Sequence, residues 1–250
     1  MKVGVLCFSL GLGLASCGVA HATLLSNGDL DRTYMQEIVP GFSLPKPDQW
    51  MNVGSRSITG PYEDEMSSEP WAGPMPTPAT NNGFNVTTGD ANGLDWGVFF
   101  KPFSGTPNNG AATGHLYQDV AGTAGLTYTM TGWAGAEPNA LLGGAEFALE
   151  FLNAGGGLIG GATYDLMPTL KTPNGQPFSY KQYSLSAVAP AGTSYVRVRA
   201  SMIDAMNNPA GGGQAYVVDD FTLNAVPEPA TMAILGFGVV AALRRRAAKK

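Results

Sequence analysis

The chain contains very little cysteine, histidine or charge. Its 250 residues include only two cysteines and two histidines, and charged side chains make up 13% of the total. Cys7 and Cys17 both fall within the first 22 residues, so a chain without that stretch has no disulfide and no thiolate metal site. The remaining residues do not need bridges, because about 200 residues can bury roughly 70% of their unfolded surface in one core.

The first 22 residues have the organisation of a secretory signal peptide. Lys2 supplies a positive n-region, residues 3–19 form an apolar h-region, and Ala20-His21-Ala22 is a small-x-small cleavage site. We predict cleavage after Ala22. The alternative is that Leu14-Ala15-Ser16-Cys17 acts as a lipobox, which would make Cys17 a lipidated N-terminus.

Charge is distributed unevenly along the chain. Residues 23–229 contain nineteen acidic and eight basic side chains, a formal charge of −11. An acidic body repels phosphate backbones, so we do not expect nucleic acid as a partner. The remaining positive charge lies at the two termini, where it is predicted to stay on the cytoplasmic side of a membrane while the body is translocated.

The last 25 residues combine a short apolar run with a basic end. Residues 230–243 carry no charge, and Arg244, Arg245 and Arg246 follow directly. As a helix the run would span about 21 Å, which is short of the ~30 Å hydrocarbon core. The arginine cluster after the run nevertheless favours one short C-terminal transmembrane helix over a buried core helix. Pro227 and Pro229 block helix propagation, so that helix can begin only after them.

Val226-Pro227-Glu228-Pro229, the apolar run and Arg244 to Arg246 resemble, in this order, the PEP-CTERM sorting signal of exported Gram-negative proteins. The resemblance implies that residues 226–250 are recognised and processed by an exosortase-type membrane protease near the Pro-Glu-Pro. It also implies a final location at the outer surface, in the envelope or in the extracellular matrix of a bacterium that makes exopolysaccharide. The alternative is an ordinary membrane anchor that is never cleaved.

The region between these two ends has the pattern of an all-β protein. Its apolar residues alternate with polar ones and show no long 3.6-residue periodicity. The residues expected to face inward are Tyr128, Met130, Phe147, Leu149, Phe151, Tyr183, Leu185, Ala187, Val196, Val198, Ala200, Val217, Asp219, Phe221 and Leu223. At least six strands of this kind predict one antiparallel β-sandwich over residues 23–225. A doubly wound fold is excluded because the crossover helices are missing.

Two stretches give more local expectations. Residues 40–110 are rich in Pro, Gly and Asn and are predicted to be a loop-rich insertion, from which the apolar segment 94–103 returns to the core. The glycine-rich stretch Asn153 to Gly157 is predicted to be the turn of a hairpin.

Four short segments resemble, in order, the landmarks of galactose-binding-like jelly rolls, a group that includes carbohydrate-binding modules. They start at Leu24, Gly114, Ala148 and Ala215. The resemblance implies an eight-to-ten-strand jelly roll whose first and last strands lie close together. It also implies a structural calcium ion near the termini.

By position, the resemblance assigns the calcium ligands to Asp31 and Asp219. The residues themselves support part of this, because Asp219 has the same parity as Val217 and Phe221, and a buried carboxylate needs a cation or hydrogen-bond donors. The alternative is that Asp219 faces a loop edge and caps backbone N–H groups.

Nothing in the sequence favours catalysis. No metalloprotease, nucleophile-elbow or Cys/His motif occurs, and His115 is the one histidine beyond the leader. Glu146 and Glu150 would lie about 13–14 Å apart along one strand face, beyond the ~5–9.5 Å used by glycosidase pairs. We therefore expect no enzyme, although carboxylates from different strands stay open as an alternative.

Glycan binding is the favoured function. Trp133 shares a strand face with three threonines and is the best candidate for a stacking platform, with Glu150, Arg197 and Arg199 as polar partners. A β-bulge at Gly132 that turns Trp133 inward is the competing possibility. The sequence thus predicts a non-catalytic exported module associated with exopolysaccharide or another glycan. A purely structural envelope protein is the main alternative, and a polysaccharide-active enzyme is a second one.

Overall fold

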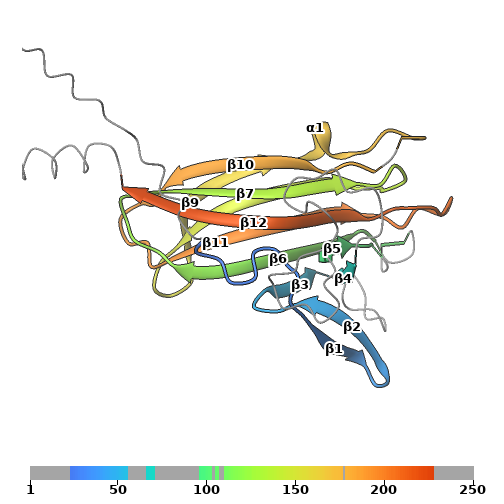
Figure 1. Cartoon of the computed structure of the whole chain (residues 1–250), viewed down its shortest axis with the longest axis horizontal. Coiled ribbons are helices and arrows are strands. Elements are labelled where there is room, and N and C mark those ends of the chain that lie inside the picture. Colours follow the sequence, from blue (N-terminus) through green and yellow to red (C-terminus); the bar gives the residue numbers. More distant parts are fainter. Residues whose placement is uncertain are drawn as a thin grey trace, which may run out of the picture.

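The computed structural model describes residues 23–55, 66–70, 96–102, 105–106, 110–176 and 178–227 (Figure 1). The predicted signal peptide, the apolar run 230–243 and Arg244 to Arg246 lie outside these residues, as does most of the stretch 56–95. Within the described part no helix is long and apolar enough to cross a bilayer.

The described residues form an antiparallel sandwich of two five-stranded sheets, as the alternating pattern predicts. The first sheet has the order β10 (Lys181–Val188), β7 (Leu126–Ala136), β12 (Tyr216–Pro227), β5 (Trp96–Phe100) and β4 (Met66–Pro70). The second has the order β3 (Met51–Ser55), β6 (Ala112–Ala121), β11 (Tyr195–Ala205), β8 (Gly144–Leu152) and β9 (Leu158–Asp165). A separate hairpin joins β1 (Thr33–Val39) to β2 (Phe42–Pro47), and α1 (Met167–Leu170) is one short turn.

Alternation along the strands forms the core between the sheets. Tyr128 and Met130 of β7 face Phe147 and Phe151 of β8, and all four belong to one buried cluster. The inward faces expected for β10 and β11 also lie in or against this cluster. Side chains of opposite parity lie on the outer faces, because successive side chains of a strand point to opposite sides of a sheet.

The predicted hairpin is confirmed between β8 and β9. Asn153 Oδ1 accepts hydrogen bonds from the backbone N–H groups of Gly155 and Gly157, both at 2.9 Å. Gly156 has φ of +79°, a conformation that glycine adopts without a steric cost. The short turn therefore returns the chain directly along β8.

The last strand does not keep one parity, so the expected inward set is wrong in part. Asp219 pairs with Trp133, whereas Thr222 pairs with Thr131, so two residues of β12 oppose Gly132 alone. This β-bulge reverses the alternation. Phe221 and Leu223 point into the core as expected, but Val217 joins a second cluster on the outer face, and Asp219 shares its parity.

The first and last described segments lie side by side, as the resemblance to galactose-binding-like folds implies. Leu24 N–H donates to Leu223 O at 2.8 Å, and Phe221 N–H donates to Gly28 O at 2.6 Å. A Cβ at Gly28 would lie 2.3 Å from the Phe221 carbonyl oxygen, so only glycine permits this approach. The N-terminal segment thus continues the first sheet beside β12 where β5 has ended.

The loop-rich region contributes short strands. Residues 97–100 are buried, which confirms that the apolar segment around Trp96 returns to the core. Pro70 ends β4, which among the described residues pairs with β5 alone and is an edge strand of the sheet. An edge is where proline costs no ladder hydrogen bond.

Candidate functional site

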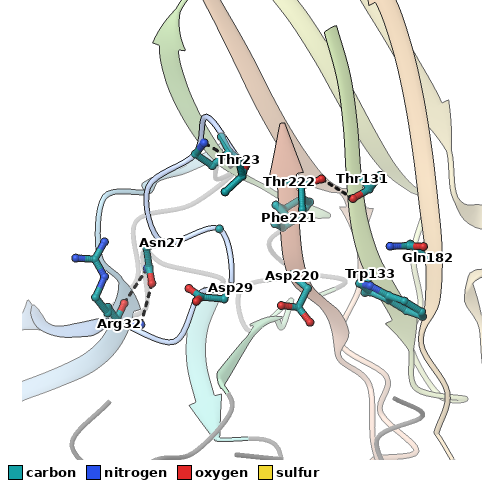
Figure 2. A pocket seen from close by; sticks show the side chains of 12 residues that line it. Thr23, Asn27, Asp29, Arg32, Thr131, Trp133, Gln182, Asp220, Phe221 and Thr222 are labelled. Carbon is teal, nitrogen blue, oxygen red and sulfur yellow. Dashed lines mark hydrogen bonds between the residues drawn. The ribbon is translucent and has the colours of Figure 1, made fainter. Parts of the chain in front are cut away.

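A cavity of about 440 Å³ opens on the outer face of the first sheet (Figure 2). Strands β7, β10 and β12 form one side of it, and the segment before β1 forms the other. Its lining residues are Thr23, Leu25, Asn27, Gly28, Asp29, Arg32, Thr131, Trp133, Gln182, Asp220, Phe221 and Thr222. The volume lies within the range of about 300–1,000 Å³ that is usual for small-ligand sites.

The sheet register places Trp133 on this face. Trp133 pairs with Gln182 of β10 on one side and with Asp219 of β12 on the other. It is half-buried and packs against the outer cluster that includes Phe99 and Val217. The bulge lies in β12, opposite Gly132, and does not turn the tryptophan inward. Part of the indole lines the cavity, so the inward-facing alternative is wrong.

Hydroxyl groups continue the same face toward the end of the strands. Thr131 Oγ1 and Thr222 Oγ1 lie 2.7 Å apart in a hydrogen bond across β7 and β12, and Thr129 makes the same contact with Ser186 of β10. These four hydroxyl groups make this part of the face polar without charge. Such a surface suits a ligand that presents both C–H groups and hydroxyls.

The opposite wall is held in place by Asn27. Asn27 has φ of +53°, and its side-chain amide donates to the carbonyls of Arg32 and Asp48 at 3.0 and 2.8 Å. Asn27 Oδ1 accepts from Arg32 N–H at 2.9 Å. These bonds fix the turn that carries Asp29, a lining residue whose carboxylate points toward the side of Asn27 and Arg32 in Figure 2.

The charged groups give the cavity an acidic character. Asp29 and Asp220 are half-buried, whereas Arg32 is exposed and lies 3.7 Å from Asp48 in an ion pair. Carboxylates accept hydrogen bonds from hydroxyl donors, and a guanidinium donates them. The cavity thus combines an apolar ring with acceptors and donors, but disfavours a ligand of negative charge.

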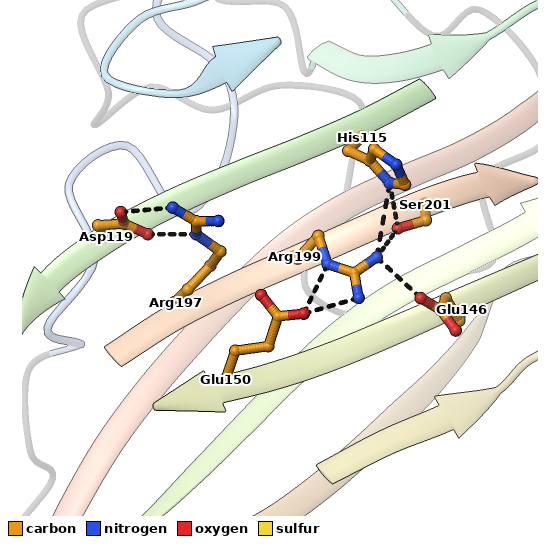
Figure 3. A network of polar contacts seen from close by, with 7 residues as sticks. All are labelled: His115, Asp119, Glu146, Glu150, Arg197, Arg199 and Ser201. Carbon is orange, nitrogen blue, oxygen red and sulfur yellow. Dashed lines mark hydrogen bonds and ion pairs between the residues drawn. The ribbon is translucent and has the colours of Figure 1, made fainter. Parts of the chain in front are cut away.

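A second polar group of residues lies on the outer face of the other sheet (Figure 3). Arg199 of β11 donates to Glu146 at 2.8 Å and to Glu150 at 2.8 and 3.0 Å, and both carboxylates project from β8. Arg199 also donates to the buried hydroxyl of Ser201. Burial alone would lower the pKa of the Arg199 guanidinium, but the hydrogen bonds and attraction of Glu150 and Glu146 outweigh it and raise that pKa.

His115 completes this network. Its Nδ1 lies 2.8 Å from Ser201 Oγ and 3.5 Å from an Arg199 nitrogen. Because arginine has only donors, the arrangement requires a lone pair on Nδ1 and therefore a neutral imidazole. Burial, followed by the positive charge of Arg199, lowers the pKa of His115. His115 lies on β6, which pairs with β3 on one side and with β11 on the other.

A neighbouring pair stiffens the same face. Arg197 makes a bidentate ion pair with Asp119 at 2.6 and 2.8 Å and lies 3.9 Å from the centre of the Tyr117 ring. The hydrogen bond to Asp119 is the main cause that raises the pKa of Arg197. These cations are therefore already bound within the protein.

The structure does not bring the predicted glycan face together. Trp133 lies on the outer face of the first sheet, whereas Glu150, Arg197 and Arg199 lie on the outer face of the second. They are separated by the thickness of the sandwich, so they cannot contact one small ligand. Sequence reasoning missed Asp29, Gln182 and Asp220 as neighbours of the tryptophan.

The two predicted calcium ligands lie near one end of β5. Asp31 Oδ1 accepts the N–H of Trp96 at 2.8 Å, and Asp219 directly follows Val218, which pairs with Val98. Both carboxylates are buried, and Asp219 Oδ1 accepts the N–H of Asp220 at 2.7 Å. Among the described residues no three His, Cys, Asp or Glu side chains form a metal-binding group.

Calcium prefers about six to eight oxygen ligands. Asp31 and Asp219 offer only part of such a set, so other oxygen atoms, such as backbone carbonyls or water, would supply the rest. Calcium binding here stays a prediction. Asp219 accepts a hydrogen bond from a backbone N–H group. This is the capping role that was the alternative to calcium binding.

Comparison with known families identifies the tail. The model of the PEP-CTERM protein-sorting motif matches residues 225–246. The chain therefore carries this sorting motif at its C-terminus. The motif indicates an exported protein that is sorted to the cell surface, and it implies processing by exosortase. No curated protein matches the chain as a whole.

Solved structures resemble the sandwich at low identity. The enzymatically active domain of bacteriophage CBA120 tailspike protein 4 has a TM-score of 0.48 and 12% identity; the match covers 82% of this chain and 21% of that one. The tandem CBM22 domains of Paenibacillus barcinonensis Xyn10C give 0.42 and 11%, covering 85% and 49%. TmCBM61 in complex with β-1,4-galactotriose gives 0.38 and 16%, covering 71% and 88%.

The sandwich is thus similar to carbohydrate-binding modules. The chain spans about a fifth of the tailspike domain and about half of the tandem modules. No ligand and no reaction follow from similarity at this level.

Proposed function

We propose that this protein is a non-catalytic, glycan-binding module that is displayed at the outer surface or in the extracellular matrix of a Gram-negative bacterium. The sorting motif supports the location. The observation that carries the binding role is the cavity that Trp133 lines together with hydroxyls, an amide and two carboxylates. A pyranose ring stacks its C–H face on an aromatic side chain and exchanges hydrogen bonds with such neighbours.

The charge of the cavity indicates the class of glycan. Asp29 and Asp220 outnumber Arg32, which is already paired with Asp48. The whole body is acidic as well. Glycans rich in uronate or sulfate would therefore be repelled, and a neutral polysaccharide is the ligand that we propose.

The proposed absence of catalysis is supported by the engagement of the two glutamates of β8. Glu146 and Glu150 both bind Arg199, so their carboxylates are already engaged within the protein. Release of reducing ends from a neutral polysaccharide by the purified chain would contradict this part of the proposal.

Titration of immobilised neutral polysaccharides with the full chain in mild detergent tests the binding role. We expect Trp133→Ala to weaken binding at least about tenfold, as loss of a central aromatic anchor usually does. Tyr195→Ala is the matched control, because Tyr195 is an exposed aromatic on the other sheet. Equal affinity of both variants and the parent chain would remove the proposed site.

A second variant separates binding from stability. Trp133 packs against the outer cluster that includes Phe99 and Val217, so its removal also loosens that cluster. Gln182 is exposed, and Gln182→Ala should weaken binding without changing the melting temperature. If no variant and no parent chain binds any glycan, the structural alternative of an envelope protein without a small ligand is favoured.

A further inference from the structure

One end of the sandwich has an unusual composition. We call it the exit end, and define it by the loops Gly122–Gly125, Asn153–Gly157 and Ala189–Ser194 together with the end of β12. The register places these parts together, because Tyr195 pairs with Ala121 and with Leu152, while Pro227 pairs with Leu126. In Figure 1 this is the left end of the sandwich, toward which the arrow of β12 points.

The exit end carries no charge. Its three loops consist of the sequences GTAG, NAGGG and APAGTS. The remainder of the body has a strongly acidic balance. The opposite end, in contrast, has charged groups at its surface, including Lys101 and Glu137 beside a second cavity.

Large apolar side chains are exposed around these loops. Each has 37–64% of its surface accessible, and the set is Leu158, Ile159, Val188, Tyr195 and Val226. Leu158 is the first residue of β9 and Tyr195 the first of β11, and both pair with Leu152 at the end of β8. Val188 and Val226 pair with Thr127 from opposite sides, near the start of β7. Apolar groups gathered at one surface in this way mark a contact with a membrane or a partner.

The chain leaves the fold at this end and is followed almost at once by the sorting motif. Pro227 is the first proline of Pro-Glu-Pro and still pairs with Leu126 in the sheet. The apolar run begins three residues later, at Ala230. Three residues span at most about 11 Å when fully extended. The exit end therefore lies within that distance of the segment that is predicted to enter the bilayer.

We propose that the exit end rests on the lipid surface while the chain is still anchored. The inference rests on one earlier prediction, the entry of residues 230–243 into the membrane as a helix. A lipid surface is the occupant that the short connection brings within reach of every molecule. Because the loops of the exit end carry no charged side chain, contact with lipid does not remove a charge from water. Tyrosine, here Tyr195, is a residue type that favours the membrane interface.

The proposal gives the molecule an orientation. The strands of the first sheet rise from the membrane, and Thr131 of the glycan cavity is the fifth residue after Leu126 along β7. At ~3.4 Å per residue, the cavity would lie about 17 Å above the lipid surface. The Pro-Glu-Pro would be held at the interface, where a membrane protease acts.

Site-specific fluorescence tests this contact in the full chain. A background of Cys7→Ser and Cys17→Ser receives either Leu158→Cys or Val188→Cys, labelled with an environment-sensitive dye and reconstituted in phosphatidylcholine vesicles. We expect a blue shift and quenching by nitroxide-labelled lipid at both positions. Leu141→Cys is the matched control, because Leu141 is also exposed but lies at the opposite end.

Each outcome of this experiment is decisive. Equal emission at positions 158, 188 and 141 would overturn the proposal, whether or not the chain inserts. A blue shift that needs no lipid and grows with protein concentration would also overturn it and would identify a second copy as the partner.

Glycan titration of the same labelled proteins separates the two proposals. If the labels show no lipid contact but the polysaccharide still binds, docking is wrong and the proposed function stands. If the labels do show lipid contact and no glycan binds, docking stands and the binding role is wrong.

Discussion

At the scale of single residues, the surroundings of a side chain decide what it can do. Trp133 and Arg199 are both half-buried on outer sheet faces. The tryptophan borders a cavity, whereas the arginine is surrounded by Glu146, Glu150 and Ser201, which use its donors. The first is available to a ligand, and the second stabilises the sheet.

His115 makes stability depend on pH. Its pKa in the folded protein is lower than its usual value of 6.5, so the unfolded chain binds more protons as the pH falls. The contribution of His115 is therefore fully present above about pH 6.5 and is lost as the pH falls toward the folded pKa. Urea unfolding from pH 8 to pH 5 should show this loss, and His115→Gln should show a flatter profile. A steeper profile in the variant would contradict the assignment.

Calcium binding at Asp31 and Asp219 has a thermal test. At a free calcium concentration of about 100 times Kd, binding would stabilise the fold by about 2.7 kcal/mol. For a chain of this size that corresponds to a melting temperature about 5–10 °C higher than in excess chelator. Asp31→Asn should abolish the difference. Identical melting curves with calcium and with chelator would remove the prediction.

At the scale of elements, the alternation of β7, β8, β10 and β11 was sufficient to predict which residues are buried. Tyr128, Phe147 and Val198 all lie in the core as their parity requires. The same reasoning failed for β12, because a bulge changes parity without leaving a mark in the pattern. The reason lies in another strand, where Gly132 leaves space for the ring of Phe221.

The bulge of β12 can be tested through Gly132. A Cβ there would lie 2.6 Å from the Phe221 ring and 3.0 Å from Phe147. Gly132→Ala should therefore destabilise the fold by about 1–3 kcal/mol through overpacking. Gly155→Ala is a suitable control, since its nearest contact would be an ordinary 3.4 Å to Asn153. Equal urea midpoints for the two variants would show that the bulge does not depend on this space.

At the scale of the whole molecule, the assignment of strands to sheets was beyond the sequence. Periodicity shows that Trp133 and Arg199 both face outward, but not that β7 and β11 belong to different sheets. That depends on long-range pairing, such as Thr131 with Thr222 and Arg199 with Ala148. Trp133 therefore lines a cavity, whereas its predicted partners Glu150, Arg197 and Arg199 lie on the other sheet and do not share a face with it.

Delivery to the cell surface is the central claim of this account. The chain is predicted to lose its leader after Ala22, and it carries a sorting motif directly behind the last strand. The mature product would be little more than the sandwich itself, with its first residues beside the last strand.

Intact mass spectrometry of the protein released from the cell surface tests this claim most directly. We predict a species that begins at Thr23 and ends close to Pro227-Glu228-Pro229. A cell-surface species that retains Arg244 to Lys250 would contradict exosortase processing, and an intracellular chain of full mass would contradict export.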